Sequence, residues 1–176
     1  MDAVKTTPFD SRTKVGGHPV HPMLVTYPIA LITLAVVTDV VHFTTGERRW
    51  TDFSTWLLVF GLGGGVIAAG AGWLDWLGLP KGSRAKTIGL YHAGVNNAAL
   101  ALAGVSLLLR VLDDNETGVL PFLLLLVSVG AIGAGGYLGG ELIYKLGVAV
   151  DREAFEAVTR HEVQPETVRP GRIVGG

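Results

Sequence analysis

The chain has 176 residues, of which 49% are hydrophobic and only 16% are charged, and glycine is unusually frequent at 25 residues, a balance far from that of soluble domains. The formal net charge of −1 provides no basic face, which excludes nucleic acid as the partner. Cysteine is absent, which excludes disulfides, thiolate-bound iron–sulfur clusters and covalently attached c-type haem. The composition predicts a membrane protein in which any cofactor is held by nitrogen or oxygen.

Four segments contain no Asp, Glu, Lys or Arg, and each is predicted to be a transmembrane helix. They are residues 23–38, 53–74, 88–109 and 119–140. About 20 apolar residues are needed to cross the hydrocarbon, and the first segment reaches that length by running on to Phe43. A cleaved signal peptide is the competing interpretation of this segment, but its length and the presence of Asp39 argue against it.

The connections between these segments are short, which predicts an up-down-up-down four-helix bundle and an all-α integral membrane protein. Lys81, Arg84 and Lys86 lie in the second connection, and further basic residues precede the first helix and follow the fourth. The positive-inside rule therefore predicts that both termini are cytoplasmic. We expect an N-terminal segment over residues 1–16, a transmembrane domain over 17–147 and a C-terminal tail over 148–176, part amphipathic helix and part flexible.

Two of the predicted helices carry a stripe of small residues that leads to a carboxylate. The stripes are Gly61, Gly65, Ala68, Gly72 and Asp75 in the second helix, and Gly130, Gly133, Ala134, Tyr137 and Glu141 in the fourth. Such stripes let helix backbones approach closely in lipid, so we expect both to face the bundle interior. A flat prosthetic group lying against the glycines is the alternative interpretation.

The antiparallel topology gathers polar residues at one end of the bundle. This set comprises His18, His21, Asp75, His92, Asn96 and Glu141. Ionisable groups at membrane depth pair, line a wet cavity or hold a ligand. Three histidines and two carboxylates are a suitable set for zinc or iron. Alternatively, His92 and one of His18 or His21 hold a haem b iron axially, with Asn96 as a partner that orients His92.

A structural interpretation stands beside the cofactor interpretation. Proline is favoured in the first turn of a helix, so Pro19 and Pro22 are expected to start the first helix, with the histidines capping helices or bonding headgroups. Pro28, inside the span, is expected to kink the helix or free a carbonyl. Three functions therefore remain open. The first is a redox or electron-transfer bundle, and the second is a non-catalytic scaffold or accessory subunit whose polar cluster is a hydrogen-bond network. The third, ranked last because no continuous chain of ionisable residues joins the two ends, is an ion or proton path.

A further pair is predicted at the opposite end. Asp39 follows His21 by eighteen residues, and Arg110 follows His92 by the same number, which is about five helical turns in each case. Both side chains are thus expected on one interior seam, where they form a structural ion pair that locks the first and third helices. A catalytic role for this pair is the alternative.

Four stretches carry a family resemblance: "GHPVHPMLVTYPIALITLAVVTDVV", "AAGAGWLDWLGLP", "YHAGVNNAALALAGVSLLLR" and "GGYLGGELIYKLGVAV". Over residues 16–150 the chain resembles the bacterial membrane family known as domain of unknown function 2231. The resemblance implies a four-helix bundle in the bacterial inner membrane, and the fusion of some relatives to Rieske-type domains implies electron transfer with a redox protein or quinone. The chain itself lacks a Rieske ligand set, and homo-oligomerisation remains open. The matching positions are His18, His21, Asp39, Asp75, His92, Asn96, Arg110, Gly139, Gly140 and Glu141.

Overall fold

The computed structural model describes residues 9–150, which are almost entirely helical. The helices are Val20–Leu24 (α1), Thr26–Thr45 (α2), Arg49–Gly78 (α3), Arg84–Leu112 (α4) and Val119–Gly140 (α5). A π-helical turn, Glu141–Lys145 (η1), continues α5, and the strands Lys14–Val15 (β1) and His18–Pro19 (β2) form a small hairpin before α1. Because α1 and α2 act as one span, these residues contain four helices long and apolar enough to cross a membrane. The predicted four-helix membrane bundle is confirmed, whereas the helix predicted in the tail beyond residue 150 lies outside the described residues.

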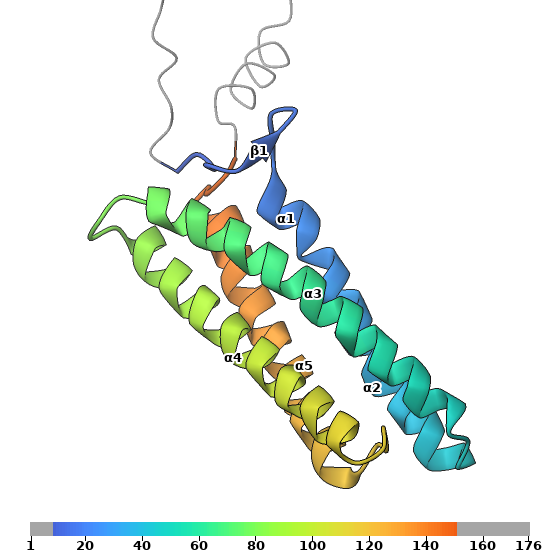
Figure 1. Ribbon diagram of the computed structural model, residues 1–176. Coiled ribbons are helices and arrows are strands. Elements are labelled where there is room, and N and C mark those ends of the chain that lie inside the picture. The colour runs from blue at the N-terminus through green and yellow to red at the C-terminus, as the bar shows by residue number, and fades with distance from the viewer. Residues whose placement is uncertain (1–8, 151–176) are drawn as a thin grey trace, which may run out of the picture.

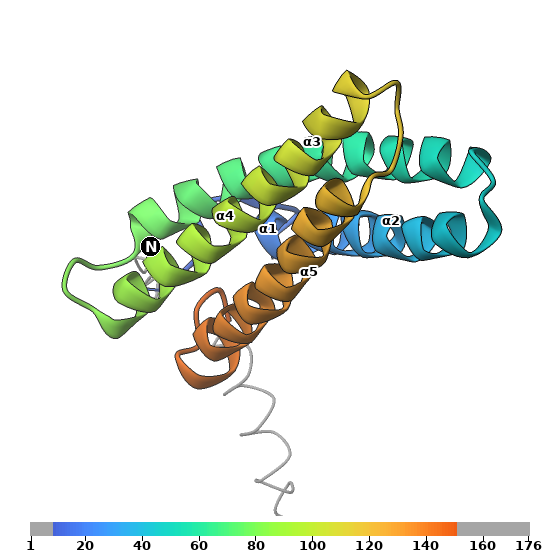
Figure 2. The ribbon, with the colours of Figure 1, turned by 90° about the horizontal axis from the view of Figure 1, so that it is seen from below.

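The four spans are arranged as two antiparallel helical hairpins. One hairpin pairs α2 with α3 and the other pairs α4 with α5, and the two meet mainly along α3 and α4 (Figure 1). Seen along the perpendicular direction, the hairpins cross at an angle rather than running side by side (Figure 2). The apolar core between them is formed by Ile32, Ala35, Leu58, Ala99, Ala103, Leu125 and Ile132.

Large apolar side chains lie on the outside of this bundle, and several small polar ones lie inside it. Val66, Ile67 and Val127 are each about two-thirds exposed, with relative exposures of 67%, 65% and 59%. In contrast, Ser106 and Ser128 are fully buried and donate to backbone carbonyls of neighbouring elements. This distribution suits a hydrocarbon solvent, in which apolar surface needs no burial and polar side chains bond across helices.

The small-residue stripe of α3 faces the interior as predicted, but the stripe predicted for α5 was assigned to the wrong face. Tyr137 is 70% exposed, and a Cβ added at Gly130 or Gly133 would meet no atom within 4 Å. The interior face of α5 instead contains Ser128 and Gly135. Gly135 is required there because an added Cβ would collide with the amide of Asn96 on α4.

The first helix also begins later than predicted. Gly16 and Gly17 have φ values of 58° and 84°, and this left-handed pair makes the tight turn of the hairpin. His18 and Pro19 are therefore residues of β2 rather than the first residues of a helix. The span is interrupted once, between Leu24 and Thr26, one turn before Pro28, which cannot donate a backbone hydrogen bond to the carbonyl of Leu24.

Candidate functional site

Two of the predicted histidines, His21 of α1 and His92 of α4, come together between the helical hairpins. Their ring centroids are 6.1 Å apart and their planes are nearly perpendicular, at 87°. Nδ1 of His21 lies 2.8 Å from the carbonyl oxygen of Ala68 on α3, and Nδ1 of His92 lies 2.8 Å from that of Gly135 on α5. A carbonyl only accepts, so each Nδ1 carries the proton, and in the neutral rings each Nε2 carries a lone pair. We call His21 and His92 the histidine pair, and the end of the bundle that holds them the histidine end.

Glycines on the two supporting helices make room for these rings. A Cβ at Gly72 would lie 2.8 Å from Cε1 of His21, and a Cβ at Gly139 would lie 3.0 Å from Cε1 of His92. Asn96, one turn after His92, donates from Nδ2 to the carbonyl of His92 at 2.8 Å. The space above these glycines is thus filled by the imidazoles themselves.

The other predicted ligands have partners of their own. Glu141 forms an ion pair with Arg84 at 2.7 Å, and the Oδ1 atom of Asp75 accepts hydrogen bonds from residues 11–13. His18 is exposed in the β-hairpin, where its Nδ1 bonds the carbonyl of Gly16 at 3.1 Å. Within residues 9–150 no group of three or more His, Asp and Glu residues is placed to hold a metal ion. The structure therefore does not bring the five predicted metal ligands together; it brings together two.

The number of ligand atoms that the histidine pair provides limits which metal ions or cofactors it can hold. A structural zinc ion needs four protein ligands, and non-haem iron commonly takes two histidines and a carboxylate. Two imidazoles without a nearby carboxylate provide neither set. A haem iron needs fewer ligands from the protein, because the porphyrin provides four of its donors.

At the opposite end, which we call the arginine end, Arg110 and Asp39 form a bidentate ion pair. Nη1 of Arg110 donates to Oδ1 of Asp39 at 2.8 Å and Nη2 donates to Oδ2 at 2.6 Å, and both side chains are fully buried. Nη1 also donates to the hydroxyls of Ser54 and Thr117 at 2.9 and 3.0 Å. The eighteen-residue spacing brings the charged pair to one seam, but these hydroxyl partners were not predicted. The network ties α2, α3 and α4 together with the connection that precedes α5.

Residues 17–152 match the family described as "Predicted membrane protein (DUF2231)". The chain belongs to the DUF2231 family. The matched region includes both the histidine pair and the buried ion pair, and it covers all four spans. No curated protein and no solved structure matches the chain. The family description assigns membrane character to this DUF2231 protein and no activity.

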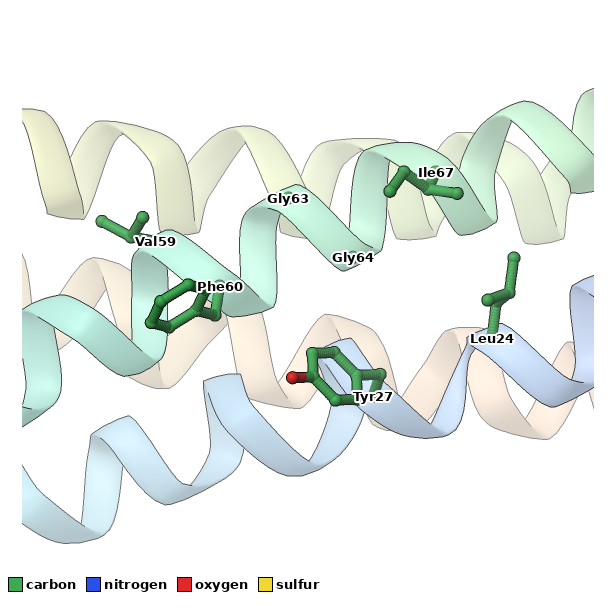
Figure 3. Close-up of a pocket in the computed structure, with 7 residues that line it drawn as sticks. All are labelled: Leu24, Tyr27, Val59, Phe60, Gly63, Gly64 and Ile67. Atoms are coloured by element: carbon green, nitrogen blue, oxygen red, sulfur yellow. The ribbon is translucent and has the colours of Figure 1, made fainter.

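The DUF2231 protein also has an apolar groove between α2 and α3 on the outside of the bundle (Figure 3). Its volume is about 350 Å³, and a Cβ at Gly64 would lie 3.0 Å from Cδ1 of Tyr27. The hydroxyl of Tyr27 is the one polar side-chain atom in the lining, so the groove offers no chemistry of its own. The lining residues are Leu24, Tyr27, Val59, Phe60, Gly63, Gly64 and Ile67.

Proposed function

We propose that this DUF2231 protein is an electron-transfer protein of the membrane that holds one haem b between His21 and His92. The supporting observation is the geometry of the histidine pair, whose ring centroids are 6.1 Å apart. Two metal–nitrogen bonds of about 2 Å each, together with about 1 Å from each coordinating nitrogen to its ring centre, require roughly 6 Å between centroids. The observed centroid separation is close to this value.

The backbone contacts of the pair support the same proposal. A histidine that ligates a metal through Nε2 usually donates its other ring nitrogen to a carbonyl or carboxylate, which fixes the tautomer and the ring orientation. His21 and His92 both have this arrangement, and their acceptors lie on two different helices, α3 and α5. A bound haem would supply one-electron chemistry, and His21 and His92 would hold it through their ring nitrogens, with the ring orientations fixed by the backbone carbonyls.

The proposal extends to location and partners. Lys81 in the α3–α4 connection and Arg84 and Lys86 in the first turn of α4 are basic, and they favour the histidine end as the cytoplasmic side of a bacterial inner membrane. A haem at that depth would exchange electrons with a redox protein or with a quinone in the bilayer. A homo-oligomer is compatible with this arrangement.

A non-catalytic scaffold or accessory subunit is the second candidate function. It is favoured because these polar side chains already have partners within the protein. Glu141 pairs with Arg84, and each Nδ1 of the histidine pair donates to a backbone carbonyl. In this alternative the histidines are part of a hydrogen-bond network that fixes the helices relative to one another.

Haem content distinguishes the two candidates. We expect protein purified from cells supplied with a haem precursor to contain one haem per chain, with a Soret band, and we expect His21→Gln and His92→Gln each to abolish it. His18→Gln and Glu141→Gln are the matched controls and should keep the haem, because both residues have other partners. Wild-type protein that contains no haem and does not bind added haemin would instead support the scaffold function.

A further inference from the structure

We infer that residues 9–13, here called the strap, close the histidine end of the bundle over the histidine pair, and that Asp75 is the latch that holds the strap shut. The strap crosses the end of the bundle beside the ends of α3 and η1 before the chain turns through the β-hairpin into α1 (Figure 1). That the covered site is a redox site rests on the proposed function, whereas the closure itself does not.

The latch consists of one carboxylate oxygen and several donors. Oδ1 of Asp75 accepts hydrogen bonds from the hydroxyl of Ser11 at 2.9 Å, from the backbone N–H groups of Arg12 and Thr13 at 2.8 and 2.9 Å, and from the hydroxyl of Thr13 at 3.0 Å. A carboxylate in the last turn of a helix is disfavoured by the helix dipole. Charge-assisted hydrogen bonds from the strap offset this cost and stabilise the Asp75 carboxylate at the end of α3.

Two further contacts hold the strap at its sides. A Cβ at Gly78 would lie 2.8 Å from Nε of Arg12, so the glycine lets the arginine lie across the last residue of α3. A cation is favoured there by the same dipole that disfavours Asp75. Close to the start of the strap, the N–H of Ala149 donates to the carbonyl of Phe9 at 2.8 Å. The strap therefore joins the end of α3 to the chain that follows η1.

The position of these anchors connects the strap to the histidine pair. The helix that carries the latch, α3, also carries the carbonyl that holds His21, and the two residues are about two turns apart. The segment after η1 follows α5, which carries the carbonyl that holds His92. Ser11, in the middle of the strap, is itself only 9% exposed. Release of the latch would open the histidine end to water-soluble reagents from that side.

Modification of histidine by diethyl pyrocarbonate tests the closure on the full-length, haem-free protein in lipid nanodiscs. Peptide mass spectrometry gives a separate rate for each residue, and the exposed His18 is an internal reference for reagent activity. In the wild type we expect His21 and His92 to react much more slowly than His18. Asp75→Ala should raise the rates at His21 and His92 about tenfold or more, since each hydrogen bond to a charged group is worth about a factor of ten or more. The matched control is Asp10→Ala, which removes a strap carboxylate that pairs with Lys14 rather than with α3.

A second variant keeps the test informative if Asp75→Ala does not fold. Replacing Ser11 by Ala and Thr13 by Val removes two hydroxyl donors but leaves Asp75 in place, and we expect a smaller rise at both histidines. Wild-type His21 that reacts as fast as His18, or a folded Asp75→Ala variant with unchanged rates, would overturn the inference. The modification assay uses haem-free protein, so it tests the closure independently of haem. If Asp75→Ala raises the two rates but the wild type binds no haem, the proposed function is refuted and the inference about the strap still holds.

Discussion

Replacement of Arg110 by leucine tests how much the buried ion pair with Asp39 contributes to the stability of the protein. Arg110→Leu leaves the carboxylate of Asp39 fully buried without its bidentate partner, and it also removes the donor to Ser54 and Thr117. Breaking a buried pair by deleting one partner costs about 3–5 kcal/mol, because the remaining charge is uncompensated. The double variant Asp39→Asn with Arg110→Leu contains no buried charge, so we expect it to be more stable than Arg110→Leu by about 2 kcal/mol or more.

The free energy of unfolding in mixed detergent–SDS micelles, followed by circular dichroism, measures this difference through a double-mutant cycle. The exposed pair Arg48–Glu116, whose side chains are 58% and 46% exposed, is the matched control. Its coupling energy should be only about 0.2–1 kcal/mol. A coupling between Asp39 and Arg110 no larger than that of the control pair would refute the conclusion that the buried pair locks the helices.

Two further predictions concern packing and orientation. Gly72→Ala should lower stability, because the new Cβ would lie 2.8 Å from the ring of His21, whereas Gly70→Ala meets nothing within 4 Å and should raise stability by about 0.5–1 kcal/mol; thermal unfolding of the two variants checks this. Reporter fusions in the α3–α4 connection at Gly82 and after Val150 should both read cytoplasmic, because basic residues concentrate at that end, and a periplasmic signal at Gly82 would contradict the proposed orientation.

The helices and the meeting of Asp39 with Arg110 were predictable because both follow from regular helix geometry. Length and apolar composition indicate the spans, and residues separated by whole numbers of turns share a seam. The outward face of α5 was not predictable in this way. Its interior and lipid-facing sides are both apolar and both contain glycine, so composition does not distinguish Gly133 from Gly135.

The partners of the Asp75 and Glu141 carboxylates could not be predicted for a different reason. Asp75 bonds residues more than sixty positions earlier in the chain, and Glu141 pairs with Arg84 across a gap of 57 positions. No periodicity relates residues so far apart in the chain. The sequence therefore indicated only that Asp75 and Glu141 lie at the same end of the bundle as the histidines, and all of them were predicted to form one ligand set. The hairpin did have a local signal, since adjacent glycines between short extended segments are typical of a two-residue turn at Gly16 and Gly17.

The low-temperature electron paramagnetic resonance spectrum of the ferric protein, reconstituted with one equivalent of haemin, tests the proposed role of the histidine pair most directly. If His21 and His92 both bind the iron, we expect a low-spin ferric spectrum. Each single variant, His21→Gln or His92→Gln, should fail to bind the haemin and should give no low-spin signal. A high-spin wild type, or a low-spin spectrum that survives the loss of either histidine, would contradict the account.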